Sequence, residues 1–178
     1  MPENYPKNYT VVDIETNGLS PQKHDIIELS AIRVRNNKVD KEFSSLVHTP
    51  NGVNYYIQNL TGITNDMLKN APSIIDAMPK FIDFIGDDII LGHNINFDLR
   101  FIKAKLRENF SKELKNESMD TMTIAKKNIK LDSYKLTSVA SHYGINTSNN
   151  HRGLKDCQIT FEVYTNLTEP EAVQTSLI

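Results

Sequence analysis

The strongest structural signal in this chain is Tyr9-Thr10-Val11-Val12-Asp13-Ile14-Glu15, a strand pattern that carries two acidic side chains. Four of these seven residues are β-branched, which favours an extended backbone. Successive side chains of a strand point to opposite faces, so we expect Asp13 and Glu15 on one face and Ile14 on the other. Carboxylates are costly to bury without a partner. The segment therefore predicts either a cation site or a strand end that is open to solvent.

Further strands and helices follow in an order that predicts a mixed sheet. Strands are expected over residues 26–34, 39–47 and 88–91. The first two of these are joined by Arg35-Asn36-Asn37-Lys38, a turn in which asparagine tolerates a positive φ. Helices are expected where apolar residues recur at helical spacing, over residues 79–85, 96–107, 120–127, 135–143 and 154–167. A hairpin followed by alternating helices and strands indicates an α/β fold with helices on the faces of the sheet.

Composition is typical of a globular protein of one domain. Of the 178 residues, 39% are apolar and 24% charged, and the formal net charge is −2. A single cysteine, Cys157, excludes a disulfide within the chain, and this favours a reducing, cytoplasmic setting. The N-terminus shows no signal peptide, and apolar runs such as Ile89-Ile90-Leu91 are too short to span a membrane. We expect the domain to occupy residues 1–167 and residues 168–178 to form a C-terminal tail, because residues 168–172 have no apolar period.

Two later segments carry further candidate site residues. Asp98 lies in the first turn of the expected helix 96–107 and follows His93 and Asn94, which end a short strand. A strand end followed by a helix start is a frequent ligand position in α/β sheets. The second segment runs from His151 to Asp156, where the last helix begins. Taken singly, each aspartate has a simpler interpretation, as a residue that favours the positive end of a helix dipole.

Taken together, the acidic residues and the histidine suit a metal-dependent nuclease. Four carboxylates can hold two hard divalent cations, and two cations can brace the attacking and leaving oxygens of a phosphodiester. A histidine can take a proton from water near neutral pH. The residues concerned are Asp13, Glu15, Asp98, His151 and Asp156.

The motifs occur in the order Asp-x-Glu, His-Asn-x-x-Phe-Asp and His-x-x-x-x-Asp, which resembles the DEDDh group of 3′-to-5′ exonucleases. Two further stretches, Leu60-Thr61-Gly62-Ile63 and Asp120-Thr121, resemble the subgroup of the proofreading epsilon subunit of bacterial DNA polymerase III. The resemblance covers about residues 8 to 167. Lys155 departs from the subgroup, which often has a small or acidic residue at this position. The resemblance implies a ribonuclease-H-like fold, with a mixed five-stranded sheet flanked by helices.

The resemblance also implies a role for each site residue. Two Mg²⁺ or Mn²⁺ ions would be bridged by Asp13, with Glu15 and Asp156 on the first ion and Asp98 on the second. His151 would deprotonate the attacking water. The 3′-terminal nucleotide would be held by residues near the metals, namely Thr16, Thr61, Gly62, Ile63, His93 and Asn94. For Ile63, a place in the apolar core is an equally good interpretation.

The function expected from these features is release of nucleoside 5′-monophosphates from the 3′ end of DNA, in proofreading or repair. The alternatives are an exonuclease for RNA or small oligonucleotides, and a catalytically silent module that binds a polymerase. The presence of all five site residues favours an active enzyme. Expected partners are single-stranded or frayed 3′ ends and a DNA polymerase catalytic subunit. The segment Gln174-Thr175-Ser176-Leu177-Ile178 is similar to peptides that bind the bacterial sliding clamp, although five residues match easily by chance and a terminus without a partner is the favoured interpretation.

Overall fold

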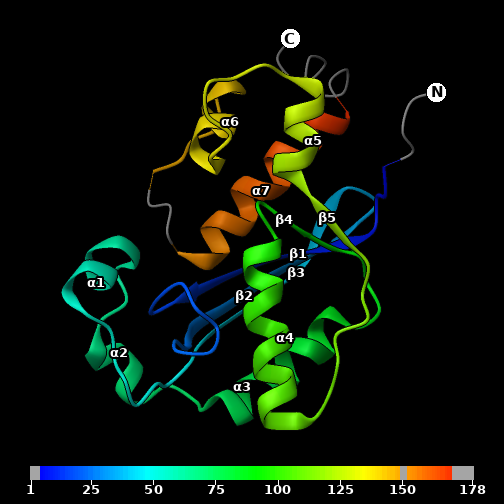
Figure 1. Ribbon diagram of the computed structural model, residues 1–178. Helices are drawn as coiled ribbons and strands as arrows, with labels where there is room; N and C mark the ends of the chain where they lie inside the picture. Colours follow the sequence, from blue (N-terminus) through cyan, green and yellow to red (C-terminus); the bar gives the residue numbers. More distant parts are fainter. Residues whose placement is uncertain (1–4, 149–151, 170–178) are drawn as a thin grey trace.

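The computed structural model of the protein describes residues 5–148 and 152–169, which form one sheet with helices on both faces (Figure 1). The sheet has five strands in the order β3-β2-β1-β4-β5. Strands β1 (Tyr9–Thr16), β2 (Ile26–Arg35) and β3 (Lys38–Leu46) form an antiparallel meander. The short strands β4 (Ile90–Gly92) and β5 (Ser118–Asp120) run parallel to β1. The predicted mixed five-stranded sheet is therefore confirmed.

The hairpin between β2 and β3 turns where the sequence predicted. Asn36 and Asn37 both have positive φ angles, of 52° and 59°. This backbone matches the right-handed twist of the flanking strands, and asparagine adopts it at low cost. The turn fixes the register of β2 with β3, in which Glu28 faces Leu46.

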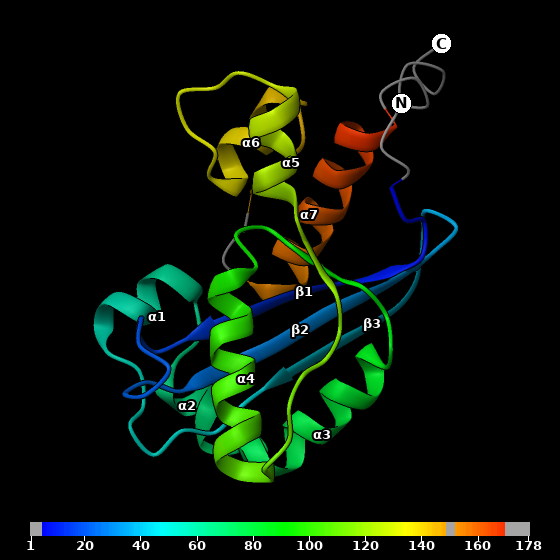
Figure 2. The same ribbon diagram turned by 45° about the vertical axis from the view of Figure 1, so that its right-hand side comes forward.

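The alternation of side chains along β1 divides the core into two layers. Val12 and Ile14 pack with helices α3 (Ile74–Ile85) and α4 (Asn96–Phe110). Val11 packs on the opposite face, in a cluster with residues of three further helices, α5 (Thr121–Asn128), α6 (Leu136–His142) and α7 (Gly153–Thr168). Figure 2 shows α7 across one face of the sheet and α3 with α4 on the other. The two acidic residues of β1 therefore face α7.

Four elements differ from the sequence-based expectation or were not assigned by it. Helix α3 begins at Ile74, where the Ser73 hydroxyl caps the chain, and Pro79 lies inside the helix. Helices α1 (Tyr55–Thr61) and α2 (Asn65–Lys69) have only seven and five residues, so their apolar period is too short to read. Strand β5 has three residues and follows no apolar run. Most of the predicted tail, residues 170–178, lies outside the described part of the chain.

Helices α1 and α2 contribute to a third, smaller apolar cluster beside the start of β2. It contains Ile27, Val53, Ile63 and Leu68. Within residues 5–148 and 152–169, no helix combines the length and the apolarity that a membrane span requires.

Candidate active site

Strand β1 presents its two acidic residues beside polar residues of β2. In the antiparallel register, Asp13 faces Ser30 and Glu15 faces Glu28. Residues opposite each other in such a pair point to the same face of the sheet. Farther along this face, Val11 faces Ile32 and both are fully buried. The polar character is thus confined to the end of β1 that leads into the next loop.

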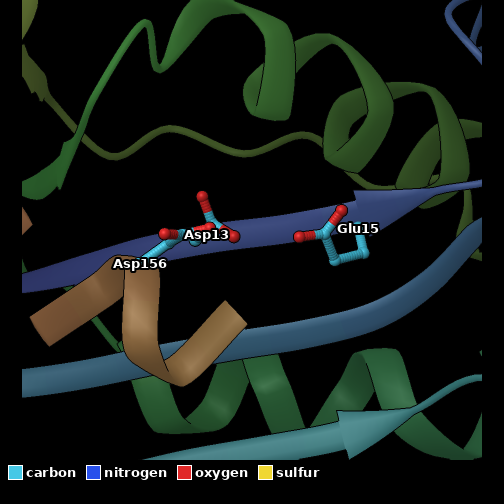
Figure 3. A group of neighbouring side chains, drawn as sticks. All are labelled: Asp13, Glu15 and Asp156. Atoms are coloured by element: carbon cyan, nitrogen blue, oxygen red, sulfur yellow. The ribbon is translucent and has the colours of Figure 1, made fainter. Parts of the chain in front are cut away.

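Helix α7 adds a third carboxylate to this group. Asp156 is 8% exposed and lies in the first turn of α7, with its side chain beside Asp13 (Figure 3). One oxygen from each of Asp13, Glu15 and Asp156 can be chosen so that all three lie within 4.8 Å of one another. The helix approaches the sheet closely here because residue 153 is glycine. A Cβ atom at position 153 would lie 2.3 Å from the Ser30 Oγ atom.

Asp98 reaches the site from the opposite side of β1. Strand β4 pairs with β1 only at Thr10 and Val11, so the later backbone of β1 has no strand neighbour on this edge. Asp98 is 6% exposed, and its Oδ1 atom accepts a hydrogen bond from the Ile14 amide at 3.0 Å. Helix α4 therefore brings a fourth carboxylate to the group.

Burial and mutual repulsion raise the pKa values of these carboxyl groups. Burial raises the pKa of Asp13 well above its usual range, and the charges of Asp98 and Glu15 raise it further. Burial, followed by the charges of Asp156 and Glu28, raises the pKa of Glu15 to about 8. Burial raises the pKa of Asp98 to about 7, although amide hydrogen bonds oppose this shift. Near neutral pH these groups therefore bind protons more readily than ordinary carboxyl groups, and a positive charge beside them would favour their charged forms.

The donor set suits hard divalent cations. Carboxylate oxygens are the preferred protein ligands of Mg²⁺ and are also suited to Mn²⁺. The Oδ2 atom of Asp13 is buried and has no hydrogen-bond partner among the described residues. A buried carboxylate oxygen without a partner is costly. A cation bound between Asp13, Glu15 and Asp156 would satisfy this oxygen, so the residues present fit the expected metal.

A pocket of about 580 Å³ opens beside the carboxylates. Glu15 and Thr16 line it, together with residues of helix α1 and of the loop after β1. Its exposed apolar side chains include Leu19, with 78% of its surface exposed, and Tyr56, with 70%. Phe97, next to Asp98 on α4, also lines it. A pocket lined by both polar and apolar groups is suited to a molecule with a charged part and a planar apolar part.

The predicted nucleotide-binding residues divide into two groups. Thr16 and Thr61 line this pocket, whereas Ile63 is fully buried with Ile27, Val53 and Leu68. Ile63 therefore has the core position that was the alternative interpretation, and the apolar surface comes from Leu19, Tyr56 and Leu60 instead. Gly62 ends α1 with a φ of 71° and does not line the pocket.

His93 and Asn94 lie in the turn between β4 and α4 and make structural contacts. The two ring nitrogens of His93 lie 2.8 Å from Thr121 Oγ1 and 2.8 Å from the Tyr134 carbonyl oxygen. Burial lowers the pKa of His93, which favours the neutral ring. Asn94 has a φ of 59°, and its backbone N–H donates a hydrogen bond to Asp120 Oδ1. Neither residue lines the pocket described above, so their contact with a substrate stays a prediction.

One predicted site residue lies outside the described part of the chain, and one residue near the site was not predicted. His151 lies outside the described residues, so its role stays a prediction. Glu28 was not predicted, although it is 2% exposed and raises the pKa values of Asp13 and Glu15. The signal available was an acidic residue inside the apolar strand Ile26-Ile27-Glu28-Leu29.

Comparison with known proteins identifies relatives in sequence. The family model described as Exonuclease matches residues 10–164. The DNA polymerase III subunit epsilon of Aquifex aeolicus (strain VF5) is 35% identical over 162 residues, which are 90% of this chain and 80% of that protein. The DNA polymerase III PolC-type of Clostridium perfringens (strain 13 / Type A) is 37% identical over 162 residues. This chain spans only 11% of the length of that polymerase.

Solved structures share the fold at lower sequence identity. The nuclease domain of 3′hExo, a DEDDh family member bound to rAMP, has a TM-score of 0.81 at 17% identity, with 94% of each chain covered. Exonuclease X in complex with 5′ overhanging duplex DNA has a TM-score of 0.75 at 23% identity, with 92% of this chain and 93% of that chain covered. The predicted ribonuclease-H-like fold is therefore confirmed. The chain belongs to the exonuclease family, and the predicted likeness to the epsilon subunit of DNA polymerase III is confirmed.

Proposed function

We propose that the protein is a metal-dependent exonuclease that removes nucleotides from the 3′ end of DNA and releases nucleoside 5′-monophosphates. The observation that carries this proposal is the position of Glu15. This residue belongs to the carboxylate group with Asp13 and Asp156, and it also lines the pocket that contains Leu19 and Tyr56. A terminal nucleotide in the pocket would therefore place its phosphodiester beside the metal ligands.

The carboxylates have distinct tasks in this proposal. Asp13, Glu15 and Asp156 would hold one cation, and Asp13 with Asp98 would hold a second. Bound cations would supply Lewis-acid stabilisation of the phosphodiester oxygens and a lower pKa for the attacking water. His151 accepts the proton that this water loses, which suits an imidazole with a pKa near neutrality.

The pocket suits the terminal nucleotide of a strand. Tyr56 and Phe97 are aromatic side chains that can stack on a base, and such stacking contributes about 1–3 kcal/mol per base. Thr16 and Thr61 also line the pocket and would lie beside the sugar of that nucleotide. Entry requires an unstacked terminal base, so frayed or single-stranded ends are preferred over stable duplex ends.

A polymerase partner is supported by the relatives in sequence. One relative is a polymerase subunit, and in the PolC-type polymerases the matching segment is part of a much longer chain. RNA is the second candidate substrate, because one protein of the same fold was solved with rAMP. Discrimination between the two depends on contacts to the 2′-hydroxyl.

The test is digestion of substrates labelled at the 5′ end. Single-stranded DNA, a mismatched primer–template and RNA of the same sequence are incubated with Mg²⁺, with Mn²⁺ or with EDTA. Shortening in single-nucleotide steps, with DNA cleaved faster than RNA and no reaction in EDTA, is the expected result. Cleavage of circular single-stranded DNA would contradict the proposal because it shows an endonuclease. Asp13→Ala is the control that should be inactive. Asp88→Ala is the control that should remain active, because the Asp88 carboxylate binds Thr10 and Arg35 and is not a proposed metal ligand.

A further inference from the structure

Glu28 is a fifth carboxylate beside the proposed metal ligands, but it belongs to none of the motifs. It lies on β2 opposite Glu15 and is 2% exposed. A buried carboxylate in a group of like charges lowers stability unless it makes compensating contacts. The contacts of Glu28 therefore indicate why an acid occupies this position.

Glu28 binds the first residues of helix α7. Its Oε2 atom accepts a hydrogen bond from the Gly153 amide at 3.1 Å. Its Oε1 atom lies 3.5 Å from the guanidinium of Arg152 and 3.4 Å from the Ser44 hydroxyl. Helix α7 has no side-chain cap of its own. An unpaired amide at a buried helix start needs an acceptor, and the positive end of the helix dipole favours an anion there. Glu28 supplies this cap from the neighbouring strand.

The Ser30 side chain leaves no room for a side chain at position 153, in the first turn of α7. A Cβ atom at position 153 would lie 2.3 Å from the Ser30 Oγ atom and 2.7 Å from the Ser30 Cβ atom. Such distances are shorter than contacts between real atoms, so a side chain at 153 requires α7 to move away from β2. Glu28 thus holds the helix start against the sheet, and the missing Cβ of Gly153 permits that approach.

The position of Asp156 depends on this contact. Asp156 follows Gly153 by three residues, so the two lie on the same side of the helix about one turn apart. A shift of α7 at position 153 therefore moves the Asp156 carboxylate relative to Asp13 and Glu15. The group in which these three carboxylates lie within 4.8 Å of one another would then open.

We propose that Glu28 is a positioning residue, which acts through the Gly153 amide to set the distance of Asp156 from the carboxylates of β1. This inference rests on the proposed function of Asp13, Glu15 and Asp156 as metal ligands. Residues that orient metal ligands from outside the coordination shell typically change metal affinity by about 10- to 100-fold when they are removed. Glu28 should belong to this class.

The first test measures Mn²⁺ binding directly, by electron paramagnetic resonance of the free ion. Glu28→Ala should bind Mn²⁺ at least about 10-fold more weakly than the unmodified protein. Glu28→Gln retains an oxygen for the Gly153 amide but loses the charge, so its affinity should be intermediate. Asp88→Ala is the matched control, because Asp88 also joins two segments by a hydrogen bond and an ion pair but lies away from the carboxylates. Unchanged Mn²⁺ affinity in folded Glu28→Ala would overturn the proposal, as would an equal loss in Asp88→Ala.

Kinetics then separate positioning from a general loss of structure. At saturating Mn²⁺, Glu28→Ala should retain the KM for a DNA oligonucleotide within about twofold, because the pocket is not altered. The Mn²⁺ concentration for half-maximal rate should rise in parallel with the binding constant. A raised KM with normal Mn²⁺ dependence would instead assign Glu28 to the substrate pocket and overturn the proposal.

The second test uses the steric contact and does not alter Glu28. Gly153→Ala should weaken Mn²⁺ binding as Glu28→Ala does, and the added substitution Ser30→Gly should restore it because it removes the two clashing atoms. Failure of Ser30→Gly to restore binding would contradict the proposed transmission through α7. A protein that shows these Mn²⁺ effects but digests no nucleic acid would support the role of Glu28 and contradict the proposed function.

Discussion

The Oδ1 atom of Asp98 lies 3.0 Å from the backbone nitrogen of Ile14 and accepts its hydrogen bond, across 84 positions of sequence. The bond occurs just beyond the point where β4 ceases to pair with β1. Asp98 therefore replaces a missing strand neighbour as well as adding charge to the site. Its two roles involve different properties, hydrogen-bond acceptance and negative charge, so substitutions can separate them.

Asp98→Asn and Asp98→Ala should differ in stability but not in activity. The asparagine amide oxygen can still accept the Ile14 hydrogen bond, whereas alanine leaves this buried amide without its partner, at a cost of about 1–3 kcal/mol. Both variants lose a negative ligand, and both should be inactive. Urea unfolding in EDTA, together with the exonuclease assay, measures the two effects. Equal stability of the two variants would show that the Ile14 bond contributes little.

The raised pKa values predict that the metal-free protein loses stability as pH rises. The pKa of Glu15 is about 8 and that of Asp98 about 7 in the folded protein, both above the ordinary values of these groups. The folded state therefore binds more protons than the unfolded state, and stability is lost as pH rises through these values. In EDTA, the melting temperature should fall between about pH 5 and about pH 8. Asp25 behaves in the opposite way. Burial acts to raise its pKa, but its hydrogen bonds and the charge of Lys105 outweigh this and lower the pKa. Its contribution to stability is therefore lost only as pH falls through the lowered pKa.

Asp13→Asn is the matched variant for this pH dependence. It removes a charge that adjoins Glu15 and Asp98, so its melting temperature in EDTA should be higher at pH 8 and vary less with pH. Added Mn²⁺ should stabilise the unmodified protein more at pH 8 than at pH 5, because the ligands must be deprotonated to bind it. Thermal denaturation followed by circular dichroism measures both effects. If the melting temperature of the unmodified protein in EDTA rises from pH 5 to pH 8, this account is wrong.

Local patterns in the sequence predicted the parts of the fold and site that depend on one segment. The β-branched run before Asp13 and the paired asparagines at 36 and 37 each specify a backbone conformation, and the structure agrees with both. The four carboxylates were predicted from their motifs, and the structure brings them to one end of β1.

The features that the sequence did not predict depend on contacts between segments. Glu28 becomes part of the site only through its register opposite Glu15 and the approach of Gly153. Ile63 is buried by Ile27 and Leu68, and neither is its neighbour in sequence. Helices α1 and α2 are stabilised by the caps Asn54 and Thr64 rather than by a long apolar period. Such contacts follow from tertiary packing, which one-dimensional periodicity does not contain.

The pocket predicts different effects for two adjacent tyrosines. Tyr56 lines the pocket and is 70% exposed, whereas Tyr55 is 79% exposed and does not line it. Loss of base stacking costs about 1–3 kcal/mol, so Tyr56→Ala should raise KM for single-stranded DNA by roughly fivefold to a hundredfold. Tyr55→Ala should leave KM unchanged. Steady-state kinetics on one oligonucleotide compare the two variants, and equal KM values would exclude Tyr56 from substrate binding.

His151 is predicted to act as the general base. If it accepts the proton of the attacking water, His151→Ala should lower the rate by about 10²- to 10⁴-fold. Mn²⁺ binding should persist, because the imidazole is not a metal ligand in this mechanism. His142→Ala on α6 is the control, since His142 packs against the Tyr143 ring away from the carboxylates. An unchanged rate and pH profile in His151→Ala would remove this residue from the mechanism.

The last prediction concerns Gln174-Thr175-Ser176-Leu177-Ile178, which lies outside the described residues. The segment combines one side-chain amide with two adjacent apolar residues, a pattern suited to a hydrogen bond and an apolar pocket on a partner. Short linear motifs bind weakly because they must become ordered on binding, and tethering then acts through effective concentration. If the segment is a clamp-binding motif, a peptide of residues 173–178 should bind a bacterial sliding clamp with micromolar affinity. Isothermal titration measures it, with the peptide carrying Gln174→Ala and Leu177→Ala as control. Absence of binding at high micromolar concentration, or equal binding by the control peptide, would assign the segment no role at the clamp.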